Sequence, residues 1–196
     1  MGLDPRASNW RLMVPPEYET FFLASAGASA ALIGLLFVGV SIAPERVFGE
    51  KADPRRQAQA ISAFSALANV FFISMASLIP GIVLGAVVTV VGAVSSVQLL
   101  GLLVRVPQSG RNMVEAVRGA ILFLASAAIY STEIYLGILL WMKPAGPSAL
   151  AGLLEIMLGA YAIGLGRAWQ LLGAPRIGLT SYALDLLERR LPRRKS

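Results

Sequence analysis

The sequence predicts an all-α, polytopic integral membrane protein with five transmembrane helices and a short C-terminal amphipathic helix. Of its 196 residues, 56% are hydrophobic and 14% are charged, whereas about a quarter of the residues in soluble domains are charged. About 20 apolar residues are enough for a helix to cross the hydrocarbon layer of a membrane, and five segments reach that length. The surplus of apolar surface therefore indicates contact with lipid.

The five spans are expected at 20–43, 57–79, 81–104, 116–142 and 148–171. Together they form a transmembrane domain over residues 20–172. An extracytoplasmic segment, 1–19, precedes this domain, and a basic cytoplasmic tail, 173–196, follows it.

The first span is rich in small residues. Ala24, Gly27, Ala31 and Gly34 lie three or four residues apart and therefore on one face of a helix. Small residues allow membrane helices to approach closely. We expect this face to pack against another helix of the same chain, with an interface between copies as the alternative. Gly152 and Gly159 of the fifth span are predicted to be close-packing positions as well.

The later spans carry signals of helix starts and breaks. Asp53 followed by Pro54 is typical of an N-cap with proline at the first helical position, and Pro147 repeats the proline before the fifth span. Asn112 to Glu115 resembles a capping box before the fourth span. Pro80 and Gly81 predict a turn that divides one long apolar run into the second and third spans.

Basic residues predict the orientation. Arg6, Arg11 and Lys143 would lie on one side of the membrane, and the other fourteen of the 17 basic residues on the opposite side. Because cytoplasmic loops carry the excess of Lys and Arg, the sequence predicts a cell-membrane protein with its N-terminus outside and its C-terminus in the cytoplasm.

The C-terminal tail places Leu184, Leu187 and Leu191 at helical spacing. We expect a short amphipathic helix on the cytoplasmic leaflet, with a solvated tail as the alternative. The residues expected to meet anionic lipid headgroups are Arg189, Arg190, Arg193, Arg194 and Lys195. The net charge of +6 is read as a topology signal, so no nucleic-acid partner is predicted.

Polar residues inside the spans are the candidate site. Ser65 and Asn69 of the second span share one helix face, and Asn69 is expected near the middle of the membrane. An unpaired amide in hydrocarbon is costly, so this face must point inward. Structural hydrogen bonding between helices is one interpretation, and lining a hydrated path is the other.

Glu133 and Glu155 are the two acids within the apolar spans. Counted from the loop between the fourth and fifth spans, they lie at about 15 Å and 12 Å depth, which predicts a pair on neighbouring antiparallel helices. Tyr130, one turn from Glu133, is a candidate hydrogen-bond donor. An ionisable residue inside a membrane is a functional hypothesis by default, so the predicted proton or cation site contains Glu133, Glu155, Tyr130, Asn69 and Ser65. A structural lock between helices is the alternative.

Cysteine and histidine are absent from the sequence, which removes thiolate chemistry and the commonest general base. The aspartates Asp4, Asp53 and Asp185 all lie outside the predicted spans. We therefore predict no enzyme activity, no cofactor and no metal site.

Two functions from different classes fit these features. The first is a small oligomeric channel or transporter for protons or cations that uses the buried Glu pair, with a second copy of the chain as a partner. The second is a non-transporting scaffold, assembly factor or regulatory subunit in which the buried acids are structural.

Overall fold

Six helices make up the described part of the computed structural model, which covers residues 14–42, 44–50, 52–105, 113–143 and 147–171. They are α1 (Pro16–Ile42), α2 (Glu45–Phe48), α3 (Pro54–Ser77), α4 (Leu84–Arg105), α5 (Met113–Met142) and α6 (Pro147–Leu171). The described ranges contain no strand. The all-α prediction is confirmed for this part of the chain, whereas the predicted amphipathic helix lies within 172–196, outside it.

Five of these helices are long and apolar enough to cross a membrane, namely α1, α3, α4, α5 and α6. The prediction of five helices long and apolar enough to span a membrane is therefore confirmed, and these helices suggest a multi-pass membrane protein. The boundaries differ by a few residues, since α1 begins at Pro16. The four-residue helix α2, between α1 and α3, was not predicted, because one helical turn has no periodicity to detect.

Local capping explains where α3 begins and ends. A side-chain oxygen of Asp53 accepts a hydrogen bond from the backbone nitrogen of Arg55 at 2.9 Å, and Pro54 occupies the first turn. The chain then turns after Ser77 at Gly81, whose φ of 78° suits glycine. These two predictions are confirmed; Asn112 of the predicted capping box lies outside the described residues.

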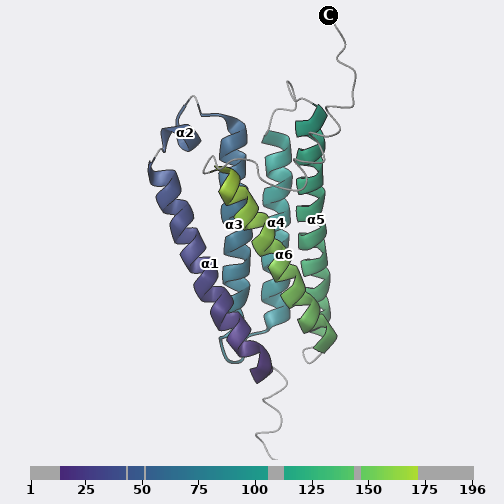
Figure 1. Ribbon diagram of the computed structural model, residues 1–196. Coiled ribbons are helices and arrows are strands. Elements are labelled where there is room, and N and C mark those ends of the chain that lie inside the picture. Colours follow the sequence, from purple (N-terminus) through teal and green to yellow (C-terminus); the bar gives the residue numbers. More distant parts are fainter. Residues whose placement is uncertain (1–13, 43, 51, 106–112, 144–146, 172–196) are drawn as a thin grey trace, which may run out of the picture.

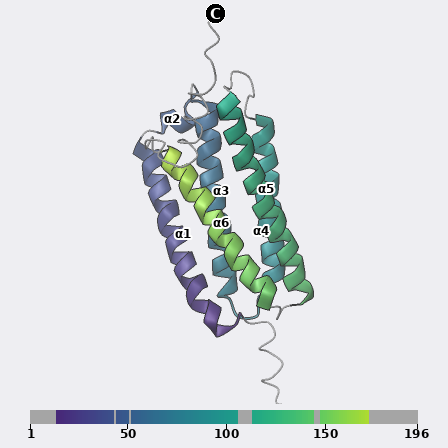
Figure 2. The same cartoon turned by 45° about the vertical axis from the view of Figure 1, so that its right-hand side comes forward.

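Helices α3, α4, α5 and α6 form a four-helix bundle. In it α3 and α5 each pack against both α4 and α6, so α3 and α5 are diagonal partners. Helix α1 packs against the outer side of α3, and α6 crosses the bundle at an incline (Figures 1 and 2). More than half of the apolar window of α3 is buried, 56% against at most 28% for the other four spans, so α3 is the central helix.

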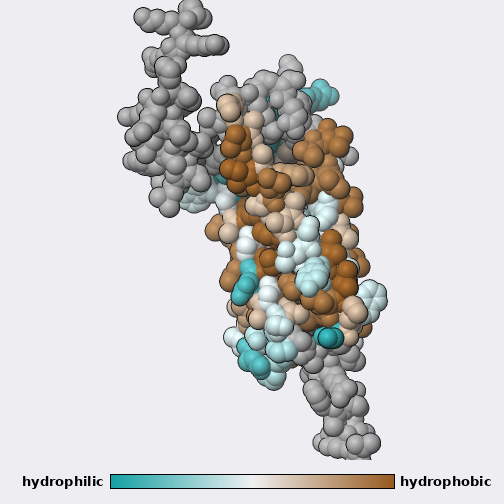
Figure 3. Space-filling model, turned by 90° about the vertical axis from the view of Figure 1, so that its right-hand side faces the viewer, coloured by the Kyte–Doolittle hydropathy of each residue, from teal (hydrophilic) through white to brown (hydrophobic). Residues whose placement is uncertain are grey.

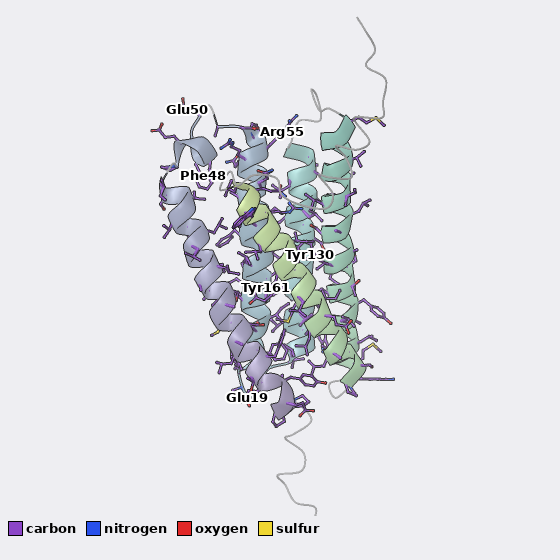
Figure 4. All side chains as sticks on the ribbon, in the orientation of Figure 1. Glu19, Phe48, Glu50, Arg55, Tyr130 and Tyr161 are labelled. Carbon is purple, nitrogen blue, oxygen red and sulfur yellow. The ribbon has the colours of Figure 1, made fainter. Side chains whose placement is uncertain are left out.

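The two ends of the bundle differ in the residues that they carry. At one end α1 leads through α2 into α3, and α6 ends; we call it the basic end, because Arg55 and Arg56 lie there. At the opposite end α3 turns into α4, and α6 begins (Figure 1). Glu19 lies at the opposite end, whereas Glu50 lies at the basic end (Figure 4).

The hydrophobic core fills the half of the bundle next to the opposite end. Its largest fully buried side chains include Ile73 of α3, Val88 of α4, and Leu153 and Met157 of α6, and α1 adds Phe22. All of them lie nearer to the opposite end of their helix than to the basic end. This side of the bundle is therefore closely packed and mainly apolar, although it also contains the buried hydroxyl group of Ser74.

The outer surface is also apolar, as a lipid-facing surface must be. Large hydrophobic side chains are exposed on every long helix, for example Phe37, Met75, Val97, Leu124 and Leu158. Figure 3 shows one face on which hydrophobic residues predominate, with pale and hydrophilic residues gathered mainly in its lower half. Because hydrophobic residues lie on both the inner and outer faces, the hydrophobic pattern of the sequence does not distinguish the buried face of a helix from its lipid-facing one.

The small residues of α1 do not pack within the chain. Ala24, Gly27, Ala31 and Gly34 are exposed, and a Cβ atom added to Gly27 or Gly34 would meet no other atom within 4 Å. The expectation that this face contacts another helix of the same chain is therefore wrong. Helix α1 buries a different face, with Phe22, Ser25, Ala26, Ser29 and Leu36, because its apolar residues surround the helix and leave several faces able to pack.

Close helix contacts occur instead at glycines of α4, α5 and α6. A Cβ atom at Gly85 would lie 2.6 Å from the backbone oxygen of Gly137, and one at Gly137 would lie 2.7 Å from the backbone nitrogen of Thr89. At the predicted packing positions of α6, a Cβ at Gly152 would meet Leu136, and one at Gly159 would meet Ile129. The backbones of α4 and α5 are therefore close enough to exclude any side chain at Gly85.

Gly85→Ala should lower the free energy of unfolding by about 1–3 kcal/mol, the usual cost of overpacking, because the added methyl group meets the backbone of α5. Gly101→Ala is the matched control on the same helix, since a Cβ there has no atom within 4 Å, and it should be neutral or stabilising by up to about 1 kcal/mol. Unfolding in mixed micelles with SDS measures both values. Equal stability of the two variants would contradict the close α4–α5 contact.

Candidate functional site

The centre of the candidate site is a carboxyl group that accepts hydrogen bonds from a neutral amide. Glu133 of α5 is 1% exposed and Asn69 of α3 is 3% exposed. The Nδ2 atom of Asn69 lies 3.0 Å from Oε1 and 2.9 Å from Oε2 of Glu133, and 3.1 Å from Oγ of Ser95 on α4. One side-chain amide therefore connects three helices.

The position of this group on the bundle axis follows from helix packing. Helices α3 and α5 face each other diagonally, and the Asn69–Glu133 hydrogen bonds link them across the axis. Gly92 of α4 lets that helix approach, since a Cβ there would lie 3.4 Å from Cδ of Glu133 and 3.0 Å from the Ile134 side chain. Glu133 lies about 14 Å along α5 from its last residue, Met142, so the carboxyl group is deep inside the span.

The predicted pair of acids does not form. Glu155 is exposed on α6, whereas Glu133 is buried on the axis. The predicted depths match, but the inward face of α6 carries Leu153 and Met157, the two neighbours of Glu155 at i−2 and i+2. A period of 3.6 residues turns Glu155 away from both, toward the outside of the bundle. The pairing prediction is wrong because depth along a helix does not determine which way a side chain points.

Tyr130 and Ser65 lie near the centre without contacting the carboxyl group through a described hydrogen bond. Tyr130 is buried one turn from Glu133 and lies at mid-height of the bundle (Figure 4). The sequence predicts Tyr130 as a hydrogen-bond donor to Glu133. In the structure, the described hydrogen bonds to Glu133 come from Asn69 instead. Ser65 is half-buried and donates to Oε1 of Gln98 on α4, which adds a second polar contact between α3 and α4.

Arg167 is a part of the interior that the sequence reasoning missed. Its Nη1 atom donates to Oγ of Ser62 on α3, and Nη2 lies 3.1 Å from Oγ of Ser126 on α5 and 3.4 Å from the Leu122 backbone oxygen. Both serines are buried. The sequence reasoning placed Arg167 among the basic residues of the cytoplasmic side and too far along α6 to reach the buried acids. One signal was available: Arg167 lies within an apolar span, one turn after Gly164, which is buried against α3.

The polar residues together occupy the half of the axis next to the basic end. Starting from that end, Arg167 contacts Ser126, Tyr130 follows one turn along α5, and Glu133 follows after about another turn. The apolar core begins directly beyond Glu133, with Leu136 on α5 and Ile73 on α3. The bundle axis therefore has a polar half and an apolar half, with Glu133 at the boundary.

This arrangement suits a proton better than a metal ion. Among the described residues, no group of three or more acidic, His or Cys side chains could hold a metal. Hard cations take several oxygen ligands, whereas the centre offers one carboxylate with an amide and a hydroxyl. A proton needs only the carboxyl oxygen, and the hydroxyl groups of Ser126 and Tyr130 can donate and accept hydrogen bonds along the polar half.

The described part of the chain does not include the residues predicted to contact lipid headgroups, namely Arg189, Arg190, Arg193, Arg194 and Lys195.

The chain matches no known protein-family model, no curated protein and no solved structure.

The effects of replacing the two partners of the central hydrogen bonds should not be additive. Asn69→Leu and Glu133→Met should each lower the free energy of unfolding by about 1–3 kcal/mol, because each leaves a buried polar group unpaired. The double variant should lose less than the sum of the two by about 0.5–3 kcal/mol. The same SDS titration measures all three variants.

Ser96→Ala is the control for this cycle, because in its described hydrogen bond the Ser96 hydroxyl donates to the Gly92 backbone oxygen of its own helix. A change within about 0.5 kcal/mol is expected. Strictly additive effects of the Asn69 and Glu133 substitutions would show that the two side chains do not interact in the membrane.

Proposed function

We propose that this protein is a membrane transporter in which Glu133 binds and releases a proton. The observation that carries the proposal is a carboxyl group 1% exposed, deep in a span, whose described hydrogen-bond donor is the neutral amide of Asn69. Ionisable groups are rare and costly inside membranes and mark proton pathways. Proton binding removes the cost of burying the charge, so protonation and conformation are coupled at this position.

The division of the bundle axis supports access to Glu133 from the basic end. Ser62, Ser126, Tyr130 and Arg167 supply polar atoms on that side, whereas closely packed apolar side chains fill the other side. A proton that reaches Glu133 from the basic end therefore needs a rearrangement of the apolar half before it can leave on the other side. This requirement favours a carrier with alternating access over an open channel.

A second copy of the chain is part of the proposal. Two outward features of the single chain are unusual for a lipid-facing surface: the exposed acid Glu155 on α6, and the small-residue face of α1 that includes Gly27 and Gly34. Small-residue faces are typical of helix contacts in membranes. Cross-linking between copies through Gly27→Cys in a bilayer, in a chain that has no other cysteine, tests this assembly, and its failure would favour a monomer.

A structural role is the second candidate, and one observation favours it. The Asn69 amide connects α3, α4 and α5, which is what a buried hydrogen-bonded group does when it holds helices together. In this interpretation the protein is a scaffold, assembly factor or regulatory subunit. It predicts the loss of folding or of a partner when the group is removed, and no intrinsic flux. Neither function assigns an enzymatic reaction, a cofactor or a metal to the chain.

The proposed orientation places the basic end and the tail in the cytoplasm, with the tail at anionic lipid headgroups of the cell membrane. Glu50→Cys lies at the basic end and Ser148→Cys at the opposite end, and both positions are exposed. A membrane-impermeant maleimide added to intact cells should label Ser148→Cys and not Glu50→Cys, because only the opposite end faces outward. Permeabilised cells should label both variants, and the reverse pattern in intact cells would invert the topology.

Proton flux into proteoliposomes should depend on Glu133. With a pH-sensitive dye inside the vesicles, an imposed pH gradient should dissipate faster with the wild-type protein than in empty vesicles, and Glu133→Gln should reduce the excess rate by about tenfold or more, because the amide cannot carry a proton. Glu155→Gln is the matched control, an acid in a span but exposed, and should retain most of the rate.

Two results would contradict the proposal. The first is a wild-type rate equal to that of empty vesicles at every gradient tested. The second is a Glu133→Gln variant that folds normally and transports protons at the wild-type rate.

A further inference from the structure

Arg167 places a positive charge inside the bundle that its described contacts do not neutralise. The guanidinium donates to two serine hydroxyls and one backbone oxygen, all of them uncharged. Its Nε atom is buried and has no hydrogen-bond partner among the described residues. Glu133, the buried acid of the same polar half, is about 10 Å along α5 from Ser126, so no described contact joins the two charges.

Both of these features indicate a negatively charged ligand. A buried charge is costly unless an opposite charge accompanies it. A buried N–H donor without an acceptor is also costly, because it has lost the hydrogen bond that it made to water. Guanidinium groups bind anions through several N–H donors in one plane. The Ser62 hydroxyl accepts from Arg167 and can turn its own hydrogen toward an anion. The Ser126 hydroxyl also accepts from Arg167 but donates to the Leu122 backbone oxygen at 2.9 Å, so it must leave that acceptor to bind an anion.

The surroundings restrict the size and charge of the ligand. Ser62 and Ser126 are 5% and 2% exposed, so they leave little surface for a large molecule. One guanidinium compensates one negative charge. The site lies about 6 Å along α6 from Leu171, near the basic end.

We propose that Arg167, together with Ser62 and Ser126, binds a small monovalent anion, a halide or a simple carboxylate, that enters from the basic end. This inference goes beyond the proton site and does not depend on it, because none of these three residues donates to Glu133 in a described hydrogen bond. The anion neutralises the guanidinium and takes the Nε hydrogen bond. A bundle with both sites carries opposite charges on one axis. The anion site stands without the carrier, and only the assignment of small anions as the transported substrate class rests on the proposed function.

Chloride binding is measured on the full chain in detergent micelles by the line width of the chloride NMR signal, which increases when chloride exchanges with a protein site. The wild-type protein should broaden the chloride signal relative to protein-free micelles, and added formate should remove this excess line width by competing for the site. Arg167→Gln should weaken chloride binding by about tenfold or more, because the charged donor is lost. Arg56→Gln removes a charge from the same end, is exposed, and should retain the wild-type excess.

The hydroxyl groups provide an independent variant in case Arg167→Gln does not fold. The double variant Ser62→Ala, Ser126→Ala keeps the guanidinium and should weaken chloride binding several-fold. Wild-type chloride affinity in either folded variant would overturn the proposal, as would a wild-type protein with no excess line width. These measurements use no pH gradient, so they can fail while Glu133-dependent proton flux is retained, and the reverse also holds.

A lipid phosphate is the competing source of negative charge at this depth. Native mass spectrometry of the delipidated protein distinguishes it. Phospholipid retained by the wild-type chain and lost from Arg167→Gln, together with no formate-sensitive chloride signal, would show that the guanidinium binds a headgroup and would overturn the small-anion assignment. Equal lipid retention by both proteins, with the chloride signal present, supports it.

Discussion

The requirement that polar groups inside a membrane find partners within the protein organises this bundle. Asn69 meets this requirement for three helices at once, because its amide nitrogen lies within 3.1 Å of Ser95 and of both oxygens of Glu133. Water cannot replace these partners in the hydrocarbon layer. The diagonal contact between α3 and α5 therefore fixes which faces of the two helices point to the axis, and α4 and α6 pack around that contact.

The second consequence is an axis with two different halves. Toward the basic end, hydroxyl groups, an arginine and a tyrosine line the interior, and beyond Glu133 the axis contains closely packed aliphatic side chains such as Ile73 and Leu153. Charges interact more strongly in such surroundings than in water. A carboxyl group at the boundary is therefore sensitive to any movement that brings water or another charge to it, which is the property that a coupled carrier requires and a purely structural contact does not.

The sequence was informative about depth and much less so about direction. Asn69 and Glu133 are unusual in apolar segments, and counting residues correctly indicated that both lie deep in their spans. The same counting also placed Glu155 at a matching depth, yet this acid points outward, and Arg167 was treated as a residue of the membrane boundary although its guanidinium reaches inward to α3 and α5. The charge of a long side chain lies several ångströms from its Cα atom. Counting residues along a helix locates only the Cα atom and not the charge.

By itself the sequence determined the number of long apolar helices, their approximate limits, the Asp53–Pro54 helix start and the turn at Gly81, because each depends on apolar length or on local backbone chemistry. Only the tertiary structure decided that α1 lies outside the four-helix bundle with its small residues exposed, that Glu133 is held by Asn69 and not paired with Glu155, and that Arg167 joins the interior. The physical reason is that a membrane helix is apolar on its lipid-facing and its inward-facing sides alike. Its hydrophobic pattern therefore does not mark the inward face, which contacts between residues far apart in the chain determine.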